Sequence, residues 1–529
     1  MTRHVGTAFL VVLAALAAAG VAARAAEYKK EHRGQITRIA KGEIEPAIAA
    51  ADAYLRKHPD DIESHFVLAV GWAQQGDIDR AMAHVRQGVA GGLPFGRFLA
   101  GPRDLLAPLV ESPAFQAFAK DHAPLLVHGP MVGSVTDSRA RFWVRTAREA
   151  QVEVVVGESP DLAGPAGRGA AGTQADADFT AVVEVTGLQP ATRYHYRVLV
   201  DGREALDAPA EFRTFPKAGE PAAFDVIFGG GAGYTPQHER MWTTLASRRP
   251  LAMLFMGDNV YIDAPKSPTV QRYCYYRRRS RPEFRAFAAS TAAFAIWDDH
   301  DFGDDNSAGG PDPDKPAWKR AVLNVFRENW VNPSYGGGEA QPGCWFRFAI
   351  GDVDFFMLDC RYWRDRKAKP PSMLGPVQKA WLKEALGAST ATFKVVASSV
   401  PWALDAKPGS KDHWGGFMEE RDELFSFLAD RRVGGVVLLS ADRHRTDLWD
   451  VEPARGCLLY EFSSSKLTND HTNGVIRESL YGYAKTCSFG LLSFDTTRDE
   501  PQVTYRIGTI DNQIVHEFTL KRSQLNEPP

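Results

Sequence analysis

Residues 254–263 read Leu-Phe-Met-Gly-Asp-Asn-Val-Tyr-Ile-Asp, an apolar run that ends in Gly-Asp and is followed by a tyrosine. This order predicts a buried strand that delivers the carboxylate of Asp258 to the carboxyl edge of a sheet, where open α/β folds keep their sites. Residues 294–301 (Phe-Ala-Ile-Trp-Asp-Asp-His-Asp) and 436–444 (Val-Val-Leu-Leu-Ser-Ala-Asp-Arg-His) are apolar runs that end in the same way. Because packing alone does not explain three such strand ends, we predict that they form one metal site.

The predicted metal ligands lie on or beside these strand ends: Asp258, Tyr261, Asp298, Asp299, Asn306, Asp442 and His444. Hard cations take oxygen ligands, and borderline metals add imidazole. A phenolate together with carboxylates suits oxidised iron, and the crowded acids of residues 298–301 need a bound cation to stay ionised. Each of these residues alone is more often a cap or a turn residue, so the prediction depends on their joint occurrence.

Two arginine-containing stretches and one glycine run have open interpretations. Arg361 follows Asp359 at strand spacing, and it either grips a phosphate group with two parallel hydrogen bonds or forms a surface salt bridge to Asp359. The arginines at 277–279 lie among tyrosines and are interpreted mainly as solvated or interfacial side chains. The glycines at 229–231 are a weak nucleotide signal, because they lack the Walker and Gly-x-Gly-x-x-Gly patterns.

The amino end of the 529-residue chain has the pattern of a secretory signal peptide, predicted over residues 1–25. A basic start is followed by a short apolar stretch and an Ala-Arg-Ala exit at 23–25. We therefore expect an exported protein, periplasmic or secreted, without stable membrane insertion once the signal is removed; the alternative is an uncleaved anchor. The net charge of −3 gives no reason to expect a nucleic acid partner. Five scattered cysteines leave room for one or two disulfides and at least one unpaired thiol.

A small helical module is predicted over residues 27–122. The pattern Gly-Glu-Ile at 42–44 recurs as Gly-Asp-Ile at 76–78, which is the 34-residue period of the tetratricopeptide repeat. One and a half repeats are too few for a free-standing solenoid, so the module is expected to pack on its neighbour. Docking of a protein partner on this module is the alternative function.

Two further domains are predicted, a β-sandwich over 125–217 and an α/β domain over 222–529. The first has strand-length apolar or alternating segments, and its residues 187–194 resemble the turn-and-tyrosine signature of fibronectin type III sandwiches. The second alternates strands with helices, as parallel sheets require. Its last two strands, near residues 502–507 and 514–518, are expected to form a hairpin.

Four motifs make the chain resemble the PhoD-like alkaline phosphatases of the calcineurin-like metallophosphoesterase superfamily. They are Gly-Asp-Asn-Val-Tyr (257–261), Trp-Asp-Asp-His-Asp (297–301), Leu-Asp-Cys-Arg (358–361) and Ser-Ala-Asp-Arg-His (440–444). The resemblance covers roughly residue 128 to the carboxyl end. It implies a multidomain α/β fold in which a metallophosphatase α/β sandwich follows a fibronectin-III-like β-sandwich; here both follow the small α-helical repeat module.

The resemblance also implies hydrolysis of phosphate mono- or diesters with iron and calcium as the metals. Asp258 would be the bridging or iron-bound carboxylate and Tyr261 the iron phenolate. Asp298 and Asp299 would serve the second metal, and Asp442 with His444 would complete the site. His300 would be a general acid or a charge stabiliser, and Arg361 a phosphate clamp. The predicted catalytic residues are therefore His300, Arg361 and His444.

Gly231 departs from the family pattern, because the family usually has a cysteine ligand in this turn. One iron ligand is lost unless water, Asp225 or Tyr234 replaces it, and zinc, manganese or magnesium become alternatives to iron and calcium. Ala441 also replaces a glycine that is common in the last motif. Two functions follow: an exported metal-dependent phosphohydrolase acting on a phosphate ester, or a catalytically degenerate binding protein that uses its helical module to dock a partner.

Overall fold

The computed structural model describes residues 28, 30–451 and 459–525, so the predicted signal peptide lies outside the described residues. The first helix of the described part covers residues 30–40. The helices that follow are α2 (Ile44–Lys57), α3 (Ile62–Gln74), α4 (Ile78–Ala90), α5 (Gly96–Ala100), α6 (Arg103–Val110) and α7 (Pro113–His122). Asp61 and Asp77 cap α3 and α4 by accepting hydrogen bonds from the backbone N–H three residues on. A helical module is thus present, and its assignment to the tetratricopeptide type stays a prediction.

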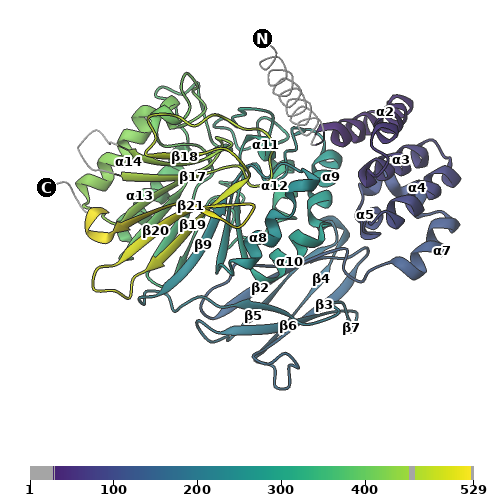
Figure 1. The fold of residues 1–529 in the computed structure, drawn as a ribbon, viewed down its shortest axis with the longest axis horizontal. Helices are drawn as coiled ribbons and strands as arrows, with labels where there is room; N and C mark the ends of the chain where they lie inside the picture. The colour runs from purple at the N-terminus through teal and green to yellow at the C-terminus, as the bar shows by residue number, and fades with distance from the viewer. Residues whose placement is uncertain (1–27, 29, 452–458, 526–529) are drawn as a thin grey trace, which may run out of the picture.

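The helical module packs against α9 (Pro268–Arg279). It lies on the side of the molecule away from α13 (Gly375–Ala388) and α14 (Met418–Asp430) (Figure 1). The rings of Phe66 and Tyr273 stack with centroids 6.1 Å apart, and the Tyr273 hydroxyl donates to Glu63 over 2.7 Å. Arg277, Arg278 and Arg279 of α9 are buried, and the Arg277 guanidinium lies 4.3 Å from the centre of the Tyr234 ring. The arginines at 277–279 are therefore interfacial side chains and not solvated ones.

A β-sandwich follows the helices. One of its sheets contains β1 (His128–Gly133), β2 (Arg139–Arg145) and β5 (Thr180–Thr186); the other contains β4 (Gly167–Thr173), β3 (Ala150–Gly157), β6 (Arg193–Val200), β7 (Arg203–Glu204) and β8 (Ala210–Arg213). In the expected turn, the Tyr194 hydroxyl accepts a 2.8 Å hydrogen bond from the Gln189 backbone N–H. This bond fixes the corner before β6, as the tyrosine corner does in other β-sandwiches.

The sandwich is continuous with the α/β domain. A nine-stranded sheet has the order β21-β20-β19-β9-β10-β11-β1-β2-β5, with β9 (Ala223–Gly229), β10 (Ala252–Met256), β11 (Ala292–Ile296), β19 (Ser488–Asp495), β20 (Gln502–Thr509) and β21 (Ile514–Lys521). The strands β9, β10 and β11 are parallel, and β1 joins β11 in parallel. The expected closing hairpin is β20 with β21.

A second sheet of seven strands faces the first. Its order is β12 (Phe346–Ile350), β13 (Val353–Met357), β14 (Phe393–Ala397), β15 (Val436–Ser440), β17 (Leu459–Ser464), β16 (Thr446–Val451) and β18 (Tyr481–Tyr483), and β13, β14, β15 and β17 are parallel. Alternate residues of a strand point to opposite faces. Val395 and Val437 therefore lie in the core between the sheets, whereas Val396 and Leu438 pack with α13 (Gly375–Ala388) and α14 (Met418–Asp430).

Helices also cover the outer face of the nine-stranded sheet. These are α8 (Met241–Ser247), α10 (Pro282–Ser290) and α12 (Lys319–Arg327). The rings of Trp242 and Phe255 lie 6.0 Å apart, which joins α8 to β10. The result is a four-layer arrangement in which the carboxyl ends of the parallel strands of both sheets meet.

Two further expectations concern membranes and disulfides. Within residues 28–451 and 459–525, no helix combines the length and apolarity needed to cross a bilayer. Cys274, Cys344, Cys360 and Cys487 are buried and free, so the structure shows no disulfide among these four. Cys457 lies outside the described residues.

Candidate metal centre

The predicted ligands lie just beyond the carboxyl ends of the parallel strands. Asp258 follows β10, Asp298 follows β11 and Asp442 follows β15. Five of the seven have left-handed backbone conformations that non-glycine residues rarely adopt: Asp258 (φ 53°), Tyr261 (φ 54°), Asn306 (φ 57°), Asp442 (φ 66°) and His444 (φ 49°). Such strain costs about 1–3 kcal/mol per residue and is typical of functional sites, where the surrounding structure enforces it.

Among the described residues, Asp258, Asp299 and His300 form a group with metal-binding geometry. Each offers one ligand atom, and these three atoms lie within 4.8 Å of one another. Asp258 is only 2% exposed, and its Oδ1 has no hydrogen-bond partner. Burial, to which Asp299 and Asp298 add, raises the pKa of Asp258 well above its usual range. A buried carboxylate oxygen without a partner in an acidic cluster fits a bound cation.

Tyr261 and His444 lie together on one side of this cluster. The Tyr261 hydroxyl is 3.4 Å from Nδ1 of His444. Burial and then the charge of Asp258 raise the pKa of the phenol well above its usual value, which a bound cation would counteract. The two side chains are therefore placed as neighbours, as the strand-end pattern predicts.

Sequence reasoning missed Asn469, which connects these two residues. Its Nδ2 lies 2.6 Å from the Tyr261 hydroxyl and 3.0 Å from Nδ1 of His444. Asn469 follows β17, the fourth parallel strand of the second sheet, whose end reads Ser-Ser-Ser-Lys-Leu-Thr-Asn over 463–469. A polar tail on another apolar strand was the signal available in the sequence.

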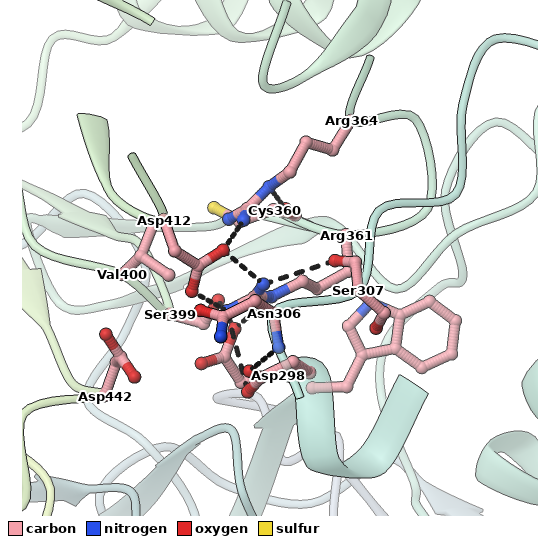
Figure 2. A network of polar contacts seen from close by, with 12 residues as sticks. Asp298, Asn306, Ser307, Cys360, Arg361, Arg364, Ser399, Val400, Asp412 and Asp442 are labelled. Atoms are coloured by element: carbon pink, nitrogen blue, oxygen red, sulfur yellow. Dashed lines mark hydrogen bonds and ion pairs between the residues drawn. The ribbon is translucent and has the colours of Figure 1, made fainter. Parts of the chain in front are cut away.

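Arg361 lies among carboxylates rather than at a free phosphate position (Figure 2). Its guanidinium is 0% exposed; Nε donates to Asp298 over 2.5 Å, and Nη1 and Nη2 donate to Asp412 over 2.9 and 3.1 Å. Nη1 also donates to the Ser307 carbonyl, and Nη2 is 3.6 Å from Asp299. Because these groups use the guanidinium donors, the arrangement disagrees with the phosphate clamp expected from the sequence.

The alternative salt bridge from Arg361 to Asp359 is also absent among the described contacts. The Asp359 carboxylate is buried and accepts hydrogen bonds from Trp297 Nε1 and from the backbone N–H groups of Arg361 and Tyr362. Asp412 is a second residue that sequence reasoning missed. It binds Arg361, Arg364 and Lys407, which makes it the anionic centre of the network in Figure 2.

The remaining predicted ligands have other partners. Asp442 accepts a 2.7 Å hydrogen bond from Lys407. The Asn306 backbone N–H donates to Asp299 over 2.6 Å, while its side-chain amide donates to Asp305. The structure thus places Asn306 beside the cluster through its backbone, and it does not group Asp442 or the Asn306 amide with the three closest donors.

His300 lies at the mouth of the cluster, with its side chain 20% exposed. Its Nδ1 binds the Asp263 carboxylate, and its ring centre is 4.6 Å from that of Tyr261. Burial lowers the pKa of the imidazole, but the charge of Asp258 and the hydrogen bond to Asp263 outweigh this effect and raise the pKa to about 10. With Nδ1 bound to Asp263, Nε2 lies 4.0 Å from Oδ1 of the exposed Asp305.

Two segments of the chain match known protein families. A family model described as PhoD-like phosphatase matches residues 226–486, which contain the strand-end residues described above. Residues 226–486 therefore form a PhoD-like phosphatase domain. A second model, described as a domain of unknown function (DUF7800), matches residues 123–218, the region of the β-sandwich.

The individual relatives have low sequence identity to this chain. Alkaline phosphatase D of Bacillus subtilis (strain 168) is 26% identical over 313 residues, so the match spans about half of each protein, 50% of this chain and 52% of that relative. The solved structure titled "Structure of PhoD" aligns with a TM-score of 0.63 at 18% identity, over 75% of this chain and 90% of that one. The purple acid phosphatase PPD1 of yellow lupin (Lupinus luteus) aligns with a TM-score of 0.55 at 11% identity, over 75% of each chain.

Gly231 of the PhoD-like domain lies in a turn that has no room for a side chain. Its φ is +64°, and a Cβ built on it would lie 2.0 Å from the Ser465 carbonyl oxygen. The segment after β17 lies directly on this turn, since the backbone N–H of Asn469 donates to the Gly231 carbonyl over 3.1 Å. Gly231 is therefore part of the close packing between the two sheets. Loss of the cysteine ligand alone does not account for a glycine at this position.

Neither proposed substitute for the missing cysteine reaches the cluster. Asp225 lies near the amino end of β9 and accepts a hydrogen bond from Ser493. At about 3.3 Å per strand residue, this position is on the order of 13 Å from the end of β9 at Gly229. Tyr234 stacks on Tyr28 of the helical module, with ring centres 6.0 Å apart. The expectation that one of these two side chains replaces the cysteine is wrong for this arrangement.

Proposed function

We propose that this protein is a metal-dependent hydrolase of phosphate mono- or diesters. The observation that carries the proposal is the cluster of Asp258, Asp299 and His300 at the carboxyl ends of parallel strands in a PhoD-like domain. The Asp258 oxygen without a hydrogen-bond partner supports a cation at this position.

The donor set fits hard cations. Asp258 and Tyr261 would hold iron, and Asp298 or Asp299 a second metal such as calcium; zinc, manganese and magnesium are the alternatives, since Gly231 supplies no thiolate. When bound, such ions polarise a phosphoryl oxygen and lower the pKa of water. Asp442, His444 and Asn306 are the outer members of the proposed site.

The chain's own residues have separable roles in the proposed reaction. In this proposal His300 lies beside the metal without binding it; its imidazole, held through Nδ1 by Asp263, gives a proton from Nε2 to the leaving oxygen. Asn469 orients Tyr261 and His444 through its amide. Arg361 neutralises and holds Asp298 and Asp299, so its contribution is to orient these carboxylates.

The degenerate binding protein is not favoured. Its main argument was Gly231, but the turn around this residue is closely packed, and Asp258, Asp299 and His300 remain together. For the rest of the chain we propose export by residues 1–25, a fibronectin-III-like sandwich and a tetratricopeptide-like module that packs on the catalytic domain. A phosphate ester is the proposed substrate, and a protein partner of the helical module is a further proposal.

The test measures metal and turnover on the same sample. Protein lacking residues 1–25 is purified, its metal content is measured by mass spectrometry, and p-nitrophenyl phosphate and bis-p-nitrophenyl phosphate are supplied as substrates. We expect at least one iron, calcium or zinc per chain together with turnover of one ester.

Two variants locate the activity. Asp258→Asn should lose metal and turnover, whereas Asp225→Asn, which alters a carboxylate near the other end of its strand, should keep both. Full metal occupancy without hydrolysis of any ester would refute the proposed function. Unchanged turnover in Asp258→Asn would show that the site lies elsewhere.

A further inference from the structure

An arginine of the helical module reaches the candidate catalytic cluster. Arg33 lies in the helix over residues 30–40, outside the segment that matches the PhoD-like family. Its Nη1 donates to the Tyr261 carbonyl oxygen over 2.5 Å and to Asp263 Oδ2 over 2.6 Å. The two side chains are 13% and 21% exposed, so this ion pair is partly shielded from water.

Asp263 links Arg33 to His300. One carboxylate oxygen, Oδ2, binds Arg33, and the other, Oδ1, binds Nδ1 of the imidazole. A backbone hydrogen bond joins the same two segments: the N–H of Ile262 donates to the His300 carbonyl over 2.8 Å. Arg33, Asp263 and His300 therefore form one chain of charge-assisted hydrogen bonds that crosses from the helical module into the PhoD-like domain.

The helix that carries Arg33 is held in place by other residues. His32 is 0% exposed and lies 2.9 Å from Asp61 Oδ2 and 3.1 Å from the Ser64 hydroxyl. Ile36 and Ile39 are buried in the core. Because these contacts fix the helix, Arg33 is not needed to keep the helix in place, and its role can be tested separately from folding.

We propose that Arg33 is a positioning residue for the proton transfer, and that the helical module thereby completes the active site. With Arg33 in place, the Asp263 carboxylate is held at both oxygens and fixes the orientation of the His300 ring. Without Arg33, Asp263 keeps only one of its two charged partners and can rotate, so the ring is no longer held in one orientation. This inference rests on the proposed function, in which His300 protonates the leaving group.

The test compares Arg33→Met with Arg38→Met, a matched change at an exposed arginine of the same helix. Loss of the partner that orients a functional histidine typically costs 10–100-fold, and we expect a decrease of about this size in kcat with little change in KM. Arg33→Lys should recover part of the loss, because lysine keeps the charge without the planar fork.

The dependence on the leaving group separates positioning from a general structural effect. A poor leaving group such as phenolate needs the proton more than p-nitrophenolate does. The loss in Arg33→Met should therefore be larger for phenyl phosphate than for p-nitrophenyl phosphate. In an Asp263→Asn background, Arg33→Met should cause little further loss, because both changes break the same chain.

A crystal structure of metal-free Arg33→Met supplies a readout that does not depend on activity. We expect the Asp263 and His300 side chains to leave their single arrangement. A His300 ring still bound to Asp263 in one conformer would overturn the inference even if the wild-type protein hydrolysed no ester. So would turnover equal to that of Arg38→Met on both substrates. Absence of wild-type turnover alone would refute the proposed function and leave the crystallographic comparison to decide the positioning role.

Discussion

Placing the family's cysteine back into this chain, as Gly231→Cys, is expected to damage the fold without restoring a ligand. The residue has φ +64°, a conformation that costs a residue with a side chain about 1–2 kcal/mol. Its Cβ would also lie 2.0 Å from the Ser465 carbonyl oxygen, a backbone atom that cannot rotate away. Overpacking of this kind costs about 1–3 kcal/mol, so the total is about 2–5 kcal/mol.

Two controls divide this cost into its parts. Gly231→Ala introduces the same Cβ without the thiol and should be destabilised by a similar amount. Gly219→Ala has the same sign of φ (+78°) with no atom within 4 Å of the new Cβ, so it should lose only about 1 kcal/mol.

The assay is denaturant unfolding of the three variants, followed by iron titration of Gly231→Cys. The unfolding transition of both residue 231 variants should shift to clearly lower denaturant than that of Gly219→Ala. A Gly231→Cys protein as stable as wild type that binds iron more tightly would refute the reasoning. It would show that the turn accommodates a side chain, and that the only effect of glycine at this position is the loss of a metal ligand.

Three further predictions test other parts of the structure. Arg361→Met should lower the free energy of unfolding by about 3–5 kcal/mol, because it leaves buried Asp298 without its cation. Unchanged stability with a raised KM would instead support the interpretation of Arg361 as a phosphate clamp. Metal at 100 times its Kd should raise the unfolding free energy of wild type by about 2.7 kcal/mol and that of Asp258→Asn by much less, as thermal unfolding with and without a chelator would measure. Burial, with the charge of His65, lowers the pKa of His84 to about 4, so the neutral form is favoured in the fold and stability should fall as pH decreases from about 6.5 to 4. In His84→Asn the thermal unfolding temperature should vary less over this range, and an unchanged pH dependence would contradict the assignment.

The strand-end rule predicted much of the site because it needs only local sequence. An apolar run followed by Gly-Asp or Asp-Asp-His fixes where a carboxylate leaves a parallel strand, and the fold then brings the strand ends together. Asp258, Asp299 and His300 were found in this way and lie together. Tyr261 and His444 were found by the same rule and are neighbours.

The sequence did not reveal how these residues are held, because their partners are far away along the chain. Asp412 lies on a loop after β14 and takes the Arg361 guanidinium, which from local spacing alone looked free to bind phosphate. Arg33 precedes its partner Asp263 by 230 residues and belongs to a different module. Such pairs follow from the docking of modules, which no short sequence pattern encodes.

The boundary between the sandwich and the α/β domain was also invisible in the sequence. Gly133 of β1 pairs with Ala293 of β11, so one sheet runs through both predicted domains. Strand patterns show the existence of strands but not which sheet they join, since the period of two is the same in both cases.

The order of strands in that sheet places a constraint on synthesis. β9 is flanked by β10, which follows closely in the chain, and by β19, which begins only at Ser488. During vectorial emergence of the polypeptide, β9 therefore keeps an unpaired edge until nearly the whole chain is available, and such edges recruit other strands. A premature stop shortly before Ser488 would leave every candidate ligand encoded, yet the product would aggregate, because the last three strands protect the sheet on which those ligands depend.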